Sequence, residues 1–254
     1  MPLIGKMLCV ALLLACAVLL AAEGTAAEGI TRKQADALIE EIRQLRAVLE
    51  KLQVKAPTPA APQAAAPVPV HAVLKLDGAF QRLGKPDAPI TVVEFADYEC
   101  SFCRQFHLTS FRELRKNYID TGKVRFYSFD LPLEMHANAK VAAAAAHCGA
   151  DQGQFWSMRE ALIGNGNHLN ADTILEIARG LYLDMPGFQS CLSSGNSEAN
   201  IRKAMEQASL LSIQGTPTFI IGKTTADGVD GSVLVGALPY ANFEAEFKKF
   251  DASK

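Results

Sequence analysis

The stretch from Phe95 to Arg104, Phe-Ala-Asp-Tyr-Glu-Cys-Ser-Phe-Cys-Arg, decides how the rest of this chain is interpreted. It places Cys100 and Cys103 three positions apart, the Cys-x-x-Cys spacing of zinc sites, haem attachment and dithiol redox centres. No histidine follows Cys103 directly, which excludes c-type haem attachment. A zinc site needs more ligands than the pair supplies, and no second Cys-x-x-Cys is present. We therefore favour redox chemistry.

The two cysteines stand where a predicted strand meets a predicted helix. The run Ile90–Ala96 is β-branched and apolar, which is typical of a buried strand, and a helix is expected from Cys103 to about Ile119. Cys100 then lies at the helix N-terminus, where unpaired backbone N–H groups and the helix dipole stabilise a thiolate. The pattern predicts Cys100 as the nucleophile and Cys103 as the more shielded thiol.

The composition limits the classes of protein. The chain has 254 residues, of which 49% are hydrophobic and 20% charged, with a net charge of −2. A near-balanced charge argues against a broad basic surface for nucleic acid, so no nucleic-acid partner is expected. The hydrophobic content excludes a fully disordered chain, and the length suits one sizeable domain with additions.

The N-terminal residues resemble an export signal. A 16-residue apolar run, Met7–Ala22, is followed by small residues, so we expect residues 1–27 to be a cleaved signal peptide. Two alternatives stay open: lipidation at Cys16, and an uncleaved membrane anchor. All three interpretations, the cleaved signal included, place the remaining chain in the periplasm or another extracytoplasmic compartment, where disulfides persist.

A predicted helix and a proline-rich linker follow. Within residues 28–55, the stretch Thr31–Gln53 begins with a capping box and spaces its apolar residues 4, 3, 4, 3 apart: Leu38, Ile42, Leu45, Leu49 and Leu52. We interpret it as a coiled-coil-like helix that forms a homo-oligomer through residues 31–53; the alternative is an amphipathic helix packed on its own domain. Residues 56–70 hold five of the twelve prolines and are expected to form a semi-rigid spacer.

The rest of the chain, residues 71–254, has the element order of an α/β domain. The first predicted strand and helix are followed by a second strand, a helical block, a hairpin and a final helix. Their expected ranges are Lys123–Phe129, about Glu134–Ile213, Thr218–Ile221 with Val233–Val235 across an Asp227–Gly231 loop, and Tyr240–Phe250.

A second motif identifies the family. Gly215-Thr216-Pro217-Thr218-Phe219 follows the cysteine motif by some 115 residues, and with it the region from Gly84 to Phe250 resembles the DsbA-like branch of the thioredoxin superfamily. The resemblance implies a thioredoxin fold with a helical domain inserted at about 131–208. It implies a protein thiol-disulfide oxidoreductase or isomerase that acts on exported, cysteine-containing proteins and exchanges electrons with a membrane or soluble redox partner. No cofactor is expected beyond the redox-active Cys100–Cys103 disulfide.

The resemblance also implies roles for single residues. Cys100 is the exposed attacking cysteine and Cys103 the resolving one. Pro217 matches the family's cis-proline, and Thr216 offers backbone hydrogen bonds to a bound substrate strand. Glu94 matches a buried acid that assists proton transfer at the resolving cysteine, and we expect burial to raise its pKa.

The residues between the two cysteines depart from the strongly oxidising members, which often carry Pro-His. Here Ser101 and Phe102 are expected to face the substrate, and Phe102 donates no hydrogen bond to the neighbouring thiolate. The hypothesis is that Cys100 is less acidic than in those members and that the centre is a milder oxidant.

Two further cysteines, Cys148 and Cys191, lie in the helical block. If Cys100 pairs with Cys103, these two are left for each other, and we expect a structural disulfide; buried free thiols are the alternative. We interpret the histidines as structural or surface residues: His107, His136, His147 and His168. The competing function is a thioredoxin-like protein that handles copper or zinc with Cys100 and Cys103 as ligands, although no resident metal site is expected.

Overall fold

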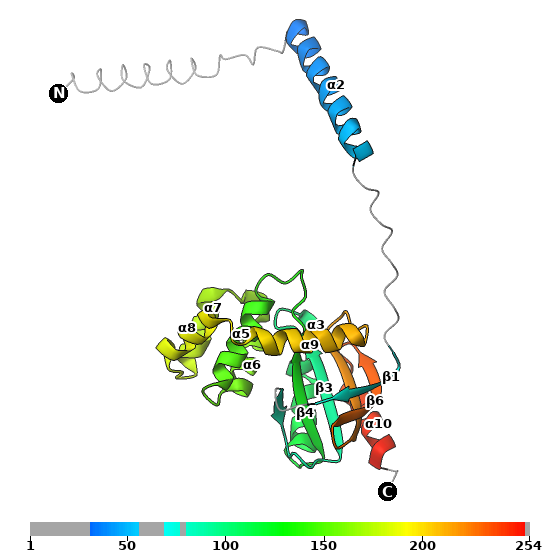
Figure 1. Ribbon diagram of the computed structural model, residues 1–254, viewed down its shortest axis with the longest axis vertical. Coiled ribbons are helices and arrows are strands. Elements are labelled where there is room, and N and C mark those ends of the chain that lie inside the picture. Colours follow the sequence, from blue (N-terminus) through cyan, green and yellow to red (C-terminus); the bar gives the residue numbers. More distant parts are fainter. Residues whose placement is uncertain (1–30, 56–68, 77–79, 252–254) are drawn as a thin grey trace, which may run out of the picture. The chain divides into compact units, whose positions relative to one another are not determined.

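The computed structural model describes residues 31–55, 69–76 and 80–251. The chain divides into two units, Met1–Ala64 and Ala65–Lys254, which are described separately (Figure 1). The expected signal peptide and residues 56–68 of the expected spacer lie outside the described residues. Within the described ranges, no helix is both long enough and apolar enough to cross a membrane.

The first unit contains one described helix, α2 (Arg32–Lys55), close to the expected range. Its start is the expected capping box: Thr31 N–H donates to Gln34 Oε1 at 2.9 Å, and Gln34 N–H donates to Thr31 Oγ1 at 3.4 Å. The apolar stripe is exposed, with 56% of the surface of Leu38, 48% of Ile42 and 62% of Leu45 open to solvent. Self-association through this stripe stays a prediction.

The second unit is built on a six-stranded sheet with the strand order β1-β6-β5-β3-β4-β2. The central strand β3 runs parallel to β4 and antiparallel to β5. The strands are β1 (His71–Lys75), β2 (Gln81–Leu83), β3 (Ile90–Ala96), β4 (Val124–Asp130), β5 (Thr218–Thr224) and β6 (Gly228–Val235). This is the thioredoxin-like α/β order expected from the sequence.

The expected bounds of the hairpin are wrong, and the two edge strands, β1 and β2, were not predicted. The expected Asp227–Gly231 loop is mostly strand, because β6 already begins at Gly228. Glycines suit this pairing: Gly222 lies opposite Gly231, and a Cβ at Gly222 would collide with the backbone of Asp230. Turn-forming residues therefore stand inside a closely paired strand.

Alternation along β3 sends successive side chains to opposite faces of the sheet. Val93 and Phe95 pack in one core with Ala204 and Ala208 of α9 (Glu198–Leu210), the helix that lies across the sheet in Figure 1. Val92 belongs to the other core, which is covered by α3 (Ser101–Leu108), α4 (Ser110–Leu114), η1 (Arg115–Ile119) and α10 (Tyr240–Asp251). Glu94 shares the parity of Val92 and therefore points towards α3.

The helices between β4 and β5 form a core of their own. They are α5 (Ala139–Ala150), α6 (Phe155–Gly164), η2 (Gly166–His168), α7 (Ala171–Gly180) and α8 (Met185–Ser194). Cys148 of α5 and Cys191 of α8 form a disulfide with their Cα atoms 5.7 Å apart. α9 is shared between the insert and the sheet, since Ile201 joins the helical core and Ala204 the sheet core.

Candidate active site

The cysteine motif follows the central strand directly. β3 ends at Ala96, and Cys100 is the N-cap of α3. Its backbone is extended, with φ −70° and ψ 119°. No side chain caps this helix, so its first backbone N–H groups are directed towards the Cys100 thiol. The Asp97 carboxylate braces the connection, accepting hydrogen bonds from Glu99 N–H at 2.7 Å and from Leu133 N–H at 2.7 Å.

The two thiols are more shielded than the sequence implied. Cys100 exposes 6% of its surface and Cys103 none, so the expected exposure of Cys100 is wrong in degree. The segment before β5 lies against Cys100, whose thiol donates a hydrogen bond to the carbonyl oxygen of Thr216 at 3.3 Å. The Thr216–Pro217 peptide bond is cis, as the motif predicted. Cys103 Sγ accepts the N–H of Asp97 at 3.5 Å.

The surroundings separate the acidities of the two thiols. A hydrogen bond from the Cys103 side chain lowers the pKa of Cys100 to about 5, with help from a hydrogen bond of the Thr216 side chain and against the opposing effect of burial. Burial raises the pKa of Cys103 well above its ordinary value, and the neighbouring Cys100 and Glu94 charges add to this. At neutral pH Cys100 is a thiolate and Cys103 keeps its proton, which is the division of roles that thiol exchange needs.

Glu94 is fully buried, as expected, but the direction of its pKa shift is the opposite of the expected one. Burial alone would raise the pKa of Glu94. The charges and hydrogen bonds of His107 and Arg159 lower it by more than burial raises it, so the net shift is downward. Arg159 Nη2 donates to Glu94 Oε2 at 2.6 Å, and His107 Nε2 lies 2.9 Å from the same oxygen. The carboxylate is therefore held ionised inside the protein.

His107 and Arg159 are the site residues that the sequence reading missed. His107 follows Cys103 by four residues, one turn of the same helix, and this spacing was a usable signal that both side chains share a face. Arg159 lies on α6 of the inserted domain, 65 residues beyond Glu94. Its guanidinium is 2% exposed and also donates to Ser128 Oγ at 2.7 Å.

Three other histidines also have carboxylate partners, and one of them is His71, whose Nε2 lies 2.7 Å from Asp230 Oδ1 at the edge of the sheet. His136 Nδ1 lies 2.9 Å from Asp97 Oδ2, beside the cysteine motif, and His147 Nε2 lies 2.7 Å from Asp130 Oδ2 at the end of β4. Both hold neighbouring segments against the sheet. Phe102 stands out from the site with 60% of its surface exposed, and Ser101 is exposed as well.

The donor set for a metal ion is small. In the part of the chain that the structure describes, no group of three or more His, Cys, Asp or Glu side chains is placed to hold one. His107, the histidine nearest to the pair in sequence, is turned towards Glu94.

Comparison with known proteins agrees with this geometry. The family model described as thioredoxin matches residues 78–232. The probable disulfide bond formation protein D of Bacillus anthracis is 30% identical over 155 residues, which are 58% of this chain and 71% of that protein. The Na(+)/H(+) antiporter NhaA 3 of Salinispora tropica is 37% identical over 139 residues. That match covers 54% of this chain and 21% of the antiporter's length.

A solved structure supports the fold. The crystal structure of Wolbachia pipientis alpha-DsbA1 is 23% identical, with a TM-score of 0.62, and the likeness covers 70% of this chain and 96% of that one. The family match spans β2 to β5 and the first part of β6, together with the cysteine motif and the inserted helices.

Proposed function

Because the chain belongs to the thioredoxin family, in its DsbA-like branch, we propose that it is a protein thiol-disulfide oxidoreductase of exported proteins. The redox group is the Cys100–Cys103 pair itself. The geometry supports this activity because it places an acidic thiol beside a segment that a substrate chain can pair with.

The reaction is two thiol-disulfide exchanges. A substrate thiolate attacks Cys100 Sγ of the oxidised pair, the Cys100–Cys103 bond breaks, and Cys103 leaves with the electron pair and takes up a proton. A second substrate thiolate then attacks the substrate sulfur of the mixed disulfide, and Cys100 leaves as the thiolate. The substrate is oxidised by two electrons and the pair is reduced; the same steps in reverse reduce or isomerise a substrate disulfide.

One observation carries the proposal: the acidic Cys100 thiol at the start of α3 contacts Thr216 O beside cis-Pro217. A low thiol pKa makes Cys100 both the reactive nucleophile and the better leaving group. The pKa of Cys100, lowered to about 5, makes this thiol the reactive one at neutral pH. The milder-oxidant hypothesis stays a prediction, which thiolate absorbance against pH tests.

The test is refolding of reduced and of scrambled ribonuclease by the full chain, with insulin reduction as a third assay. We expect Cys100→Ser to abolish all three activities. Cys103→Ser should instead accumulate a mixed disulfide between Cys100 and the substrate, because the resolving thiol is gone. Ser190→Ala, at an exposed residue of α8 outside the cysteine motif, is the matched control. Full activity of Cys100→Ser would contradict the proposal.

We further propose that the chain works outside the cytoplasm as an oligomer joined through residues 31–53. The exposed stripe of Leu38, Ile42 and Leu45 supports the second part, since a lone helix with such a stripe is marginal in water. Several catalytic domains on one oligomer would hold one misfolded substrate at several points, which suits isomerisation.

Light scattering tests the oligomer. Leu45→Asp should yield monomers, and Gln44→Asp, which adds the same charge to an exposed residue outside the stripe, should not. A monomer in the unmodified chain would contradict self-association. Loss of isomerisation with retained oxidation in the Leu45→Asp variant would link assembly to the direction of the reaction.

A further inference from the structure

The proton that Cys103 takes up or releases has no direct path to water. Cys103 and Glu94 are both fully buried. Among the described residues, the hydrogen-bond partners found for the Glu94 carboxylate are His107 and Arg159. Any proton that reaches Cys103 through Glu94 must therefore come through one of these two side chains.

Arg159 is unable to serve as the carrier. A guanidinium does not lose its proton in proteins, and Arg159 is itself 2% exposed and tied to Ser128. An imidazole, in contrast, gains a proton on one nitrogen while it releases one from the other. His107 is thus the side chain in contact with Glu94 that is able to pass a proton on.

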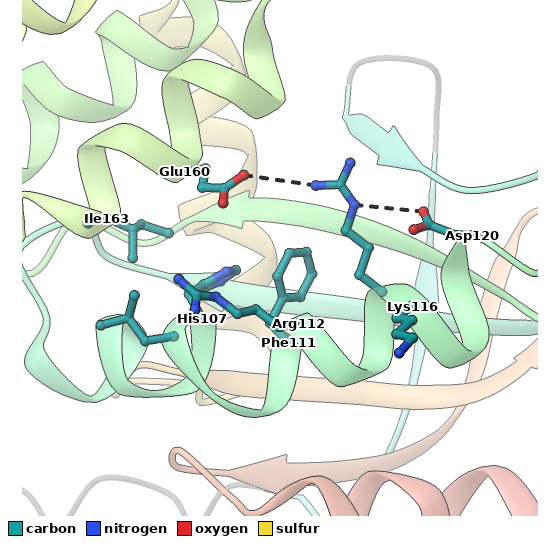
Figure 2. A pocket seen from close by; sticks show the side chains of 10 residues that line it. His107, Phe111, Arg112, Lys116, Asp120, Glu160 and Ile163 are labelled. Carbon is teal, nitrogen blue, oxygen red and sulfur yellow. Dashed lines mark ion pairs between the residues drawn. The ribbon is translucent and has the colours of Figure 1, made fainter.

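His107 also reaches solvent. It lines a cavity of about 370 Å³ between α3, α4, η1 and α6. Figure 2 shows His107 and Phe111 on one side of this cavity and Glu160 and Ile163 on the facing helix. The ring therefore stands between the buried carboxylate and a space that water enters.

The charges around the ring favour a neutral resting state. Burial and the Arg159 charge lower the pKa of His107, and they outweigh the opposite effect of Glu94 and Glu160. Arg159 Nη1 lies 3.0 Å from Nε2 and 3.5 Å from Nδ1. The other charged groups that line the cavity belong to α4, η1 and the residue that follows: Arg112, Arg115, Lys116 and Asp120. Arg115 is paired with Asp120 and Glu160 (Figure 2).

We propose that His107 relays protons between Glu94 and this cavity, which makes the cavity the proton port of the cysteine pair. The proposal rests on the proposed function. When the Cys100–Cys103 bond breaks, His107 Nε2 gives its proton to the ionised Glu94 carboxylate, and Glu94 passes a proton on to the Cys103 thiolate. The ring then takes one proton from cavity water on its other nitrogen. One proton enters for each disulfide reduced, and the steps reverse when the disulfide forms.

The experiment mixes the oxidised full chain with a reduced cysteine-containing peptide and follows reduction of Cys100–Cys103 by rapid acid quench, alkylation and mass spectrometry. Positioned acid–base groups contribute about 10²–10⁴-fold to a rate, so His107→Ala should slow the step at least tenfold. Added imidazole should restore the rate in proportion to its concentration, because it enters the space that the ring leaves beside the cavity. His168→Ala, which removes an exposed histidine, should keep the wild-type rate and ignore imidazole.

The outcomes separate the relay from the function. A wild-type rate in His107→Ala, or a slow rate that imidazole leaves unchanged, overturns the relay. If His107→Ala does not fold, the same reduction rate is measured in His107→Gln. A rate at least tenfold slower in His107→Gln, with a larger solvent deuterium isotope effect than in the wild type, supports the relay. An unchanged rate and isotope effect in this variant overturns it. A wild-type protein that the peptide does not reduce overturns the proposed function instead.

Discussion

The buried carboxylate of Glu94 on the central strand is hydrogen-bonded at 2.6 Å to Arg159 of the inserted helical domain, 65 residues further along the chain. The inserted domain therefore places a positive charge beside the buried carboxylate of the strand that leads to the cysteine pair. His107 and Arg159 together lower the pKa of Glu94 against the effect of burial, and the Glu94 anion adds to the effect of burial in raising the pKa of Cys103.

Arg159→Met should destabilise the protein and raise the pKa of Glu94. Removing one partner of a buried ion pair leaves the other charge without compensation, which costs about 3–5 kcal/mol. Urea unfolding at neutral pH measures the loss, and carbon-detected NMR of Glu94 measures the pKa. Arg112→Met, at an exposed position, is the control and should change the free energy of unfolding by less than about 0.5 kcal/mol. An equally small change in Arg159→Met would contradict the assignment.

The Cys100 thiol should titrate near pH 5 in thiolate absorbance at 240 nm, and Cys103 should stay protonated well beyond its ordinary range. Cys103→Ala removes the hydrogen bond that contributes most, so the pKa of Cys100 should rise in that variant. Ser101→Ala, which leaves this bond in place, should shift it much less. An unchanged titration in Cys103→Ala would show that the helix N-terminus and Thr216 suffice.

Phe102→His should make the centre more oxidising. The side chain is 60% exposed, so the substitution disturbs little packing, and a histidine beside Cys100 supplies the donor that Phe102 lacks. We expect the pKa of Cys100 to fall and the equilibrium with glutathione to shift towards reduced protein. Phe102→Leu keeps an apolar side chain and should leave both values near wild type. A fall of the same size in Phe102→Leu would point to lost bulk as the cause.

The His147–Asp130 pair should give stability that depends on pH. Burial lowers the pKa of His147, but the charge and hydrogen bond of Asp130 raise it more, so the net shift is upward. The stabilisation is therefore complete below the unfolded value of about 6.5 and is lost as pH rises through the higher folded value. His147→Asn should lower Tm more at about pH 6 than at about pH 9. His168→Asn should lower Tm equally little at both, and a pH-independent effect of His147→Asn would contradict the pairing.

The Cys148–Cys191 disulfide should stabilise the inserted helices without taking part in catalysis. It closes a loop of 43 residues, for which the chain-entropy model gives about 4 kcal/mol. The double variant Cys148→Ala/Cys191→Ala should lose a large part of this in urea unfolding and keep Cys100-dependent insulin reduction. Peptide mapping without reduction checks the pairing directly; two alkylated thiols in the unfolded, unreduced chain would refute it.

The parts of the fold that sequence predicted well have strong local patterns. β3 was located at its observed bounds because the apolar and β-branched run between Pro89 and Asp97 is interrupted only by Glu94. β1 and β2 were missed because they are short edge strands whose exposed residues interrupt the apolar pattern. The start of β6 was predicted wrongly because glycine usually marks a turn. Here Gly228 and Gly231 lie within the strand, where the absence of a side chain lets the neighbouring backbone approach closely.

By itself, the sequence determined the position of the cysteine pair at a helix start and the cis-proline that lies beside it. These features depend on spacing and on residue types within a few positions, so they are readable before folding. Only the tertiary structure decided how far Cys100 is covered and in which charge state Glu94 is held. Both depend on groups that lie far apart in sequence, Thr216 for the thiol and Arg159 for the carboxylate. In a buried site, the neighbours that folding brings together set the pKa, because water no longer screens their charges.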